Sequence, residues 1–224
     1  VNQGAVMGDS FGLENVLWFA NNKEDAHEEP TIKRSRSHDY VSKEVINVRE
    51  NVGLIEVANF SKHQFKGKDA RKFLDHVMAG KLPKPGRISL SPMLSYRGKL
   101  CGDLTVACLD ENEFLVFGSG AAQEMHRRWF ESHLNKFDVN YKNRSDEFHG
   151  LSIAGPNSRK VLEKIVRDDV SNDKFKFRDS RRIFVGGVPA IINRISFTGE
   201  LGYEIYVAPH YQIGRAHVWT PVTD

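Results

Sequence analysis

Short runs of alternating hydrophobic and polar residues, separated by turn-forming residues, dominate the chain from residue 42 onward. Such runs are typical of β-strands, whose side chains point alternately to the two faces of a sheet. Other stretches repeat their hydrophobic residues with the spacing of a helix. The predicted helices cover 43–50, 68–79, 121–136 and 157–167. The predicted strands cover 54–57, 63–66, 88–95, 100–109, 114–117, 139–141, 150–154, 183–185, 188–195 and 203–207.

The hydrophobic faces of the last three helices indicate the core that they cover. Ser42 is a suitable N-cap for the first helix, and Gly80 is expected to end the second. Strands joined by tight turns, with helices between them and no GxGxxG or Walker sequence, predict an α+β fold of predominantly antiparallel sheets with packed helices. The helix residues expected to face the core are Phe73, Leu74, Val77, Met78, Met125, Trp129, Phe130, Leu134, Val161, Leu162, Ile165 and Val166.

Residues 1–41 differ from the rest of the chain. They contain aromatic clusters at Phe11 and at Trp18-Phe19, followed by an acidic run and a basic run. We interpret this segment as a solvated connector whose aromatic residues pack against a domain outside this sequence, because the segment is too polar to bury a core of its own. The remainder, 42–212, is predicted to form two lobes, about 42–136 and 137–212.

Composition and charge argue against several classes of protein. The net charge is only +3 and basic residues alternate with acidic ones, which disfavours a nucleic-acid partner. No apolar run approaches the roughly 20 residues that cross a bilayer, so no membrane association is expected. Cys101 and Cys108 lie in one predicted strand at an odd separation, so they should face opposite sides and not pair. No spacing of His, Cys or acidic residues is typical of a metal site, and no metal is expected.

One predicted hairpin carries a carboxylate in an apolar setting. Asp103 lies beside Leu104 and Val106 in a strand that otherwise suits burial. A partly buried carboxylate can accept a hydrogen bond from an amine or ring N–H, and its pKa is tunable. The plainer interpretation is an acid that caps a turn at a strand edge, and the residues alone favour that interpretation.

A second acidic stretch spans 196–206. Two glycines flank Glu200 and leave the backbone free to approach a ligand closely. Glu204 follows in a predicted strand, with Tyr203 and Ile205 on the opposite face. A carboxylate in this place can accept the paired N–H groups of a heterocycle. The alternative is a solvent-facing acid in a hairpin, and the residues do not decide between the two.

Three motifs together resemble the glycine-cleavage T-protein (aminomethyltransferase) family, which binds folate. They are the hairpin Gly98–Leu104, the helix start Leu151–Pro156 and the turn Ser196–Glu204, in the order that the family has. The resemblance covers roughly residues 42–212. It implies the T-protein-like folate-binding fold, of which this sequence would hold the first two lobes and lack the third.

Further stretches resemble the folate-binding regions of dimethylglycine and sarcosine dehydrogenases. In those enzymes an N-terminal FAD domain oxidises a methylamine, and the C-terminal region passes the one-carbon unit to tetrahydrofolate. The resemblance therefore implies an enzyme fragment that uses folate and serves a small methylamine substrate, with 1–41 as the linker to a missing FAD domain and its electron-acceptor partner. It also implies a cytoplasmic location, or the mitochondrial matrix in a eukaryote. The stretches are 11–19, 40–44, 48–54, 102–106 and 114–120.

Position by position, the resemblance assigns roles to individual residues. Asp103 matches the acid that contacts and helps activate the folate amine nitrogens, so it is the expected catalytic residue. Glu204 matches an acid that recognises the pterin ring. Phe197 and Phe60 occupy positions of apolar contacts with the pterin or aminobenzoyl group. The other residues expected to bind the cofactor are Tyr203 and Glu200.

Some positions depart from the family pattern. Gly102 replaces the first acid of an Asp-Asp pair, Lys99 replaces a glycine, and Leu90 replaces a Tyr. Two alternatives stay open: a stand-alone aminomethyltransferase that takes its group from a lipoyl carrier protein, and a non-catalytic folate-binding relative. The aromatic segment before Ser42 argues against the first, and the missing late cysteine motif argues against an iron–sulfur-assembly relative.

The last stretch of the chain, 213–224, does not continue the family pattern. It resembles the translation of a sequencing-library adapter, so we expect no function there. A divergent natural C-terminus is the alternative.

Overall fold

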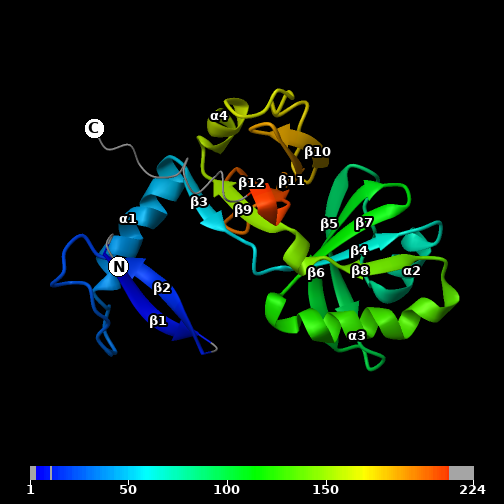
Figure 1. Cartoon of the computed structure of the whole chain (residues 1–224), viewed down its shortest axis with the longest axis horizontal. Coiled ribbons are helices and arrows are strands. Elements are labelled where there is room, and N and C mark those ends of the chain that lie inside the picture. Colours follow the sequence, from blue (N-terminus) through cyan, green and yellow to red (C-terminus); the bar gives the residue numbers. More distant parts are fainter. Residues whose placement is uncertain (1–3, 11, 212–224) are drawn as a thin grey trace.

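The computed structural model describes residues 4–10 and 12–211, and within them the strands form three antiparallel sheets. Two five-stranded sheets build two lobes, and a two-stranded hairpin lies to one side of them (Figure 1). The predicted α+β fold with predominantly antiparallel sheets is confirmed. Phe11 and the adapter-like stretch 213–224 lie outside the described residues.

The first sheet has the strand order β5-β6-β7-β4-β8, and helices α2 and α3 cover one of its faces. Phe65 of the sheet lies between Phe73 of α2 and Phe130 of α3, with ring centroids 5.2 and 4.9 Å away. Burying each of these rings contributes roughly 2–3 kcal/mol. The elements are β4 (Ser61–Lys66), α2 (Ala70–Val77), β5 (Arg87–Leu94), β6 (Leu100–Asp110), β7 (Glu113–Gly118), α3 (Gln123–His133) and β8 (Asn140–Asn143).

The second sheet has the order β10-β11-β12-β9-β3, and α4 packs against it. Gly186 and Gly187 form the two-residue turn between β10 and β11 at φ values of 59° and 79°, which only glycine adopts freely. This hairpin was predicted from the glycine pair and is confirmed. The elements are β3 (Gly53–Glu56), β9 (His149–Ala154), α4 (Ser158–Glu163), β10 (Ser180–Val185), β11 (Val188–Asn193) and β12 (Gly202–Val207).

The two sheets do not follow the predicted division at residue 136. Strand β3 precedes the first lobe in sequence but pairs with β9 of the second sheet. Strand β8, predicted to open the second lobe, pairs with β4 of the first sheet. The alternation of hydrophobic residues identifies a strand but not its partner, because pairing depends on long-range contacts. The chain therefore crosses between the lobes at 57–60 and again at 144–148.

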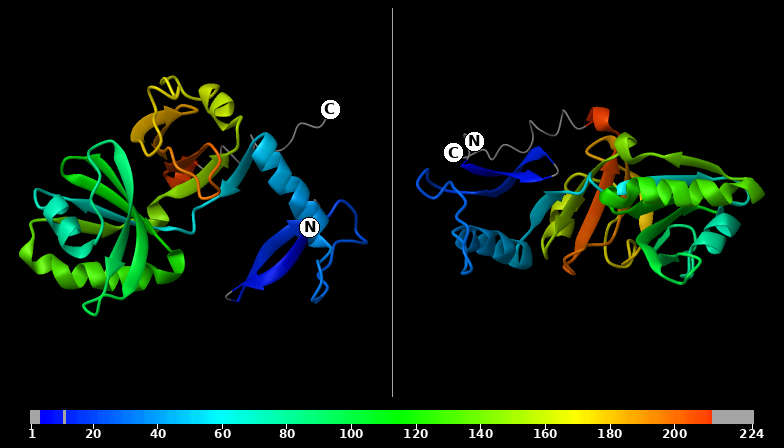
Figure 2. Two further views of the ribbon diagram at one scale, coloured as in Figure 1. Left: turned by 180° about the vertical axis from the view of Figure 1, so that it is seen from behind. Right: turned by 90° about the horizontal axis from the view of Figure 1, so that it is seen from below.

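The N-terminal segment forms more structure than predicted. Strands β1 (Ala5–Ser10) and β2 (Leu13–Phe19) pair as a hairpin beside α1 (Ser37–Glu50). Trp18 is buried against Tyr40 of α1, with ring centroids 5.0 Å apart. The prediction that this segment buries no core is therefore wrong, because the helix supplies the partner ring. Hairpin and helix extend away from the first lobe, with the second lobe between them (Figures 1 and 2).

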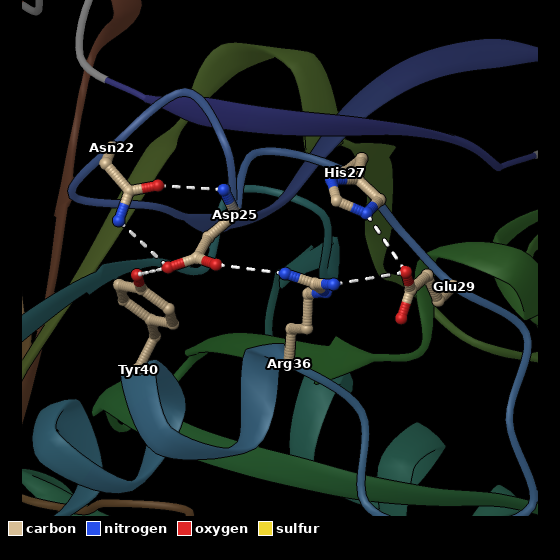
Figure 3. A network of polar contacts seen from close by, with 6 residues as sticks. All are labelled: Asn22, Asp25, His27, Glu29, Arg36 and Tyr40. Carbon is tan, nitrogen blue, oxygen red and sulfur yellow. Dashed lines mark hydrogen bonds and ion pairs between the residues drawn. The ribbon is translucent and has the colours of Figure 1, made fainter.

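The charged runs that follow β2 fold back onto the start of α1 (Figure 3). The Tyr40 hydroxyl donates to Asp25 at 2.6 Å, and Arg36 bonds to both Asp25 and Glu29 at 3.1 and 3.2 Å. The hydrogen bond from Tyr40, supported by the Asn22 amide and by Arg36, lowers the pKa of Asp25. These groups are solvated, as predicted for the segment, so each pair adds little stability.

Helix boundaries are where local prediction fails most. Helix α1 begins at Ser37 rather than after Ser42, and none of its residues is buried. In α3, Met125 is 51% exposed and His126 takes the buried position. Helix α4 ends at Glu163, short of the predicted end. The helical period of the hydrophobic residues therefore predicts that a helix exists better than it predicts where the helix begins or ends. Among the described residues, no helix is long and apolar enough to cross a membrane.

Candidate functional site

The two sheets face each other over a small inter-lobe core. The Phe117 and Tyr206 rings stack there with centroids 4.6 Å apart. Because alternate residues of a strand share a face, the pairing register shows which polar side chains are turned toward this space. The buried residues of the inter-lobe core are Ile88, Ala107, Leu115, Phe117, Ile191 and Tyr206.

Asp103 lies on the face of the first sheet that is turned toward the second lobe. It precedes Thr105 by two residues, and Thr105 pairs with Phe117 of the inter-lobe core. The side chain of Asp103 is exposed, whereas its neighbour Leu104 on the opposite face is fully buried. The partly buried carboxylate, the less favoured of the two interpretations of this hairpin, is therefore not found. An exposed carboxylate here can still accept a proton or a hydrogen bond from a ligand between the lobes.

Glu204 lies on β12, on the face that carries Tyr206. It pairs with Asn193 of β11 and Ser152 of β9, so it occupies the middle of the second sheet. The Tyr206 hydroxyl donates to Glu204 Oε2 at 2.8 Å. Burial raises the pKa of the Glu204 carboxyl, and the hydrogen bond from Tyr206 offsets part of that rise. A carboxylate has about four acceptor sites, so this one keeps capacity for ligand N–H groups.

Sequence reasoning missed Lys62, the residue that links these elements. Lys62 is fully buried on β4, and its Nζ donates to the carbonyl oxygens of Ala58 and Phe60 at 2.6 and 2.7 Å. The same Nζ lies 5.9 Å from the centroid of the Tyr206 ring. Burial lowers the pKa of the ammonium to about 8. The predicted strand starts at His63 and so leaves Lys62 outside it; extending the alternation by one residue places Lys62 on the inward face.

The two expected apolar contacts, Phe60 and Phe197, differ in how far they are buried. Phe60 lies in the 57–60 crossing, directly before β4 and partly buried. Phe197 is 98% exposed in the loop that precedes β12. Only Phe60 is therefore held in place beside the inter-lobe space.

The two other expected contacts, Glu200 and Tyr203, both precede Glu204 in the sequence. Glu200 lies in the loop before β12 beside a cavity of about 300 Å³, and a hydrogen bond from Thr198 lowers its pKa. Tyr203 is fully buried in the core of the second lobe, 5.6 Å from the Phe175 ring, and its hydroxyl accepts from Arg159. The Tyr203 ring therefore lies on the opposite face of β12 from Glu204, inside that core.

A cavity of about 320 Å³ opens between the lobes on the other side of Tyr206. Two guanidinium groups line it, and both already have acidic partners: Arg182 bonds to Glu113, and Arg144 bonds to Glu147 at 2.7 Å. The cavity also contacts Leu109, at the far end of β6 from Asp103. We therefore assign no ligand to it.

Comparison with known proteins places this geometry in context. A family model described as the GCVT N-terminal domain matches residues 1–223. Mitochondrial dimethylglycine dehydrogenase of Mus musculus is 37% identical over 203 residues, covering 89% of this chain and 23% of that protein. An aminomethyltransferase of Clostridium botulinum is 32% identical over 172 residues, covering 76% of this chain and 46% of that protein. Sarcosine oxidase subunit alpha of Rhizobium meliloti is 33% identical over 208 residues, covering 89% of this chain and 20% of that protein.

Solved structures show the same fold. The glycine cleavage system aminomethyltransferase T from Bartonella henselae superposes with a TM-score of 0.77, at 20% identity, over 96% of this chain and 53% of that one. The chain thus spans less than a quarter of the length of the dimethylglycine dehydrogenase and less than half of the aminomethyltransferase. The expected relationship is confirmed: the chain belongs to the family of GCVT N-terminal domains.

Proposed function

We propose that this chain binds tetrahydrofolate between its two lobes and delivers a one-carbon unit to it, as part of an FAD-dependent enzyme that demethylates dimethylglycine or sarcosine. The observation that carries the proposal is the pair of acids on facing sheets, Asp103 on β6 and Glu204 on β12. The identity of 37% with dimethylglycine dehydrogenase over 89% of the chain supports this branch. FAD would belong to a domain outside this sequence, and the electron acceptor would be a partner of that domain.

The surroundings of Glu204 fit a pterin-like heterocycle. Asn193, its neighbour on β11, is fully buried, and its Oδ1 accepts from Ser180 at 2.7 Å. Its Nδ2 has no partner among the described residues. An unused amide donor beside a carboxylate acceptor complements a ring that carries both a carbonyl and N–H groups. The match in donors and acceptors supports folate recognition at this strand.

Asp103 has the chemistry of a proton acceptor. When a folate amine attacks a carbon electrophile, a C–N bond forms and the nitrogen must lose its proton, which an adjacent carboxylate can take. An exposed carboxylate passes that proton on to water without a further relay. The larger contribution of the chain is to hold the amine and the electrophile together.

A stand-alone aminomethyltransferase is the second candidate function. The TM-score of 0.77 with aminomethyltransferase T and the 32% identity with the clostridial enzyme support it. Folate would bind in the same way, but the one-carbon unit would come from an aminomethylated carrier protein. Supplying the complete protein with either dimethylglycine or such a carrier separates the two functions. A non-catalytic relative would bind folate and turn over neither.

Calorimetric titration of tetrahydrofolate into the 224-residue chain tests the proposed binding. We expect saturable binding of one molecule, weakened in Glu204→Gln, because the amide replaces an acceptor oxygen with a donor. Glu56→Gln, an exposed position on β3, is the control and should bind like the wild type. No saturable heat with the wild-type chain would refute the proposal.

The role of Asp103 is tested in the complete enzyme. Asp103→Asn should lower the rate of one-carbon transfer to tetrahydrofolate by about 10²- to 10⁴-fold, the usual contribution of a general base. The rate of methylamine oxidation should stay unchanged, because it takes place in another domain. Asp110→Asn, exposed on the same strand, should leave both rates intact. Equal loss of both rates in Asp103→Asn would contradict this role.

A further inference from the structure

A buried cation, Lys62, helps to hold the 57–60 crossing between the lobes. Lys62 Nζ donates to two of its carbonyl oxygens, those of Ala58 and Phe60, at 2.6 and 2.7 Å. The crossing also bonds to the second sheet through the Val57 N–H and the Gly150 carbonyl, at 2.9 Å. Phe60 therefore has its backbone fixed from within the fold, although it lies in a segment without regular secondary structure.

The same ammonium reaches the second lobe. It lies 5.9 Å from the centroid of the Tyr206 ring, within the range of a cation–π contact. The Tyr206 hydroxyl in turn donates to Glu204, and the Tyr206 ring stacks on Phe117. Lys62 thus touches the backbone of one expected folate contact and the side chain that orients the other.

Fold stability alone does not require a charge at this position. Burying an ammonium costs several kcal/mol, and an unbranched hydrophobic side chain would fill the same space without that cost. Two hydrogen bonds to carbonyl oxygens compensate only in part, which agrees with the lowered pKa of Lys62. The ammonium does what a hydrophobic chain cannot: it fixes the direction of two carbonyl groups and one aromatic ring.

We propose that Lys62 is a positioning residue of the folate site, which holds Phe60 of the first lobe and Glu204 of the second in one geometry. This inference rests on the proposed binding of tetrahydrofolate. Lys62 acts through Tyr206 and the crossing, without touching the ligand. Without the ammonium, the crossing and the Tyr206 ring lose their common anchor, and the two contacts no longer match one ligand.

Affinity measurements on the 224-residue chain test the proposal. Lys62→Met keeps the length of the side chain and removes the ammonium, and we expect it to weaken tetrahydrofolate binding at pH 7 by about tenfold or more. Lys66→Met, on the same strand with a 69% exposed side chain, should change the affinity less than about twofold. Circular dichroism and thermal unfolding establish that each variant is folded at the temperature of the titration.

The pH dependence of the wild type gives a readout that a merely structural role would not produce. As pH rises from 7 to 9, Lys62 loses its proton and its charge-assisted hydrogen bonds weaken, so affinity should fall. Stability moves the opposite way, because the unfolded lysine titrates near 10.4 and binds more protons than the folded one in this range. The groups that face Lys62 are Asp146, which favours its charged form, and Tyr206, whose pKa is raised well above its ordinary value and which stays protonated.

The possible results separate the two proposals. Weak binding by Lys62→Met, together with an affinity that no longer falls between pH 7 and 9, supports the positioning role. Wild-type affinity in Lys62→Met overturns that role and leaves folate binding intact. If Lys62→Met does not fold, the wild-type profile decides, and a flat affinity between pH 7 and 9 overturns the role. If the wild-type chain does not bind tetrahydrofolate, the proposed function fails, and this inference with it.

Discussion

His63 and His126 place two imidazoles inside the first lobe. Both are buried, and their ring centroids are 6.1 Å apart. His63 Nδ1 bonds to the Tyr141 hydroxyl at 2.9 Å, and His126 Nε2 donates to the Cys101 carbonyl at 3.3 Å. Burial lowers the pKa of His63 to about 4 and also lowers the pKa of His126. Both rings are therefore neutral in the folded protein near pH 7.

Because these rings are buried in the neutral form, we expect the protein to lose stability in mild acid. The unfolded chain binds protons at histidine near pH 6.5, whereas folded His63 does so only near pH 4. Stability is fully present above pH 6.5 and falls as pH drops toward 4, by up to about 3 kcal/mol from His63. Urea unfolding between pH 4 and 7.5 measures this slope.

The matched variants isolate the contribution of His63. His63→Phe keeps an aromatic ring but cannot take up a proton, so the unfolding free energy should depend less on pH than in the wild type. His210→Phe, an exposed position, should keep the wild-type slope. Identical slopes in all three proteins would contradict the buried neutral state of His63.

At the scale of single residues, the sequence predicted a site better by resemblance than by local pattern. Asp103 and Glu204 were found through motifs, and their placement on facing sheets is compatible with a shared ligand. Tyr203 belongs to the same motif as Glu204, but strand alternation places its ring on the other face of β12, in the core of the second lobe. Lys62 belonged to no recognised motif, and its role depends on contacts with segments distant in sequence.

At the scale of elements, Gly150 of β9 shows why a strand can require a glycine. A Cβ at this position would lie 2.8 Å from Tyr206 Cε1 and 3.0 Å from the Val57 carbonyl oxygen. Gly150→Ala should therefore displace the Tyr206 ring, lower the unfolding free energy by about 1–3 kcal/mol and weaken folate binding. Thermal unfolding and calorimetric titration measure the two effects.

A neighbouring substitution provides the comparison for Gly150→Ala. Ile55→Ala lies on the adjacent strand β3, where the side chain is 66% exposed, and should change stability by less than about 0.5 kcal/mol. Wild-type stability and affinity in Gly150→Ala would show that the Tyr206 ring moves aside at no cost.

Most strands could be predicted from their alternation, because burial of one face imposes a period of two. A β-bulge in β6 interrupts this alternation. Leu94 pairs with Leu100 while Met93 pairs with Gly102, so Cys101 is an extra residue in β6. The extra residue resets the alternation, and both Cys101 and Cys108 lie against the core of the first lobe, although opposite faces were expected. Both are free thiols.

At the scale of the whole molecule, Phe117 joins the lobes. Its ring is 5% exposed, lies on the first sheet and stacks on Tyr206 of the second. Phe117→Ala should lower the unfolding free energy by about 3–5 kcal/mol. Amide hydrogen exchange should show lost protection in strands of both sheets, because the cavity opens at their shared interface.

The comparison for Phe117→Ala is a large aromatic residue at the surface. Phe184→Ala, 61% exposed on β10, should leave stability within about 0.5 kcal/mol of the wild type. If Phe117→Ala speeds amide hydrogen exchange only in the strands of the first sheet, the two lobes unfold independently of each other.

The fold class could be predicted from the sequence, but the assignment of strands to lobes could not. The pairing of β3 with β9 and of β8 with β4 rests on hydrogen bonds between distant segments. Such pairings leave no local pattern, since each edge strand presents the same alternation whichever sheet it joins.

The pairing of β3 with the second sheet has a consequence for synthesis on the ribosome. Strand β3 leaves the ribosome early, but its partner β9 follows about 100 residues later, on the order of 5–20 s at ordinary translation rates. During that interval β4 to β8 can complete the first sheet, while β3 waits with an unpaired edge. The nascent chain therefore carries an unpaired strand edge behind its N-terminal hairpin and helix during this interval, at the stage when a chaperone would be of most use to it.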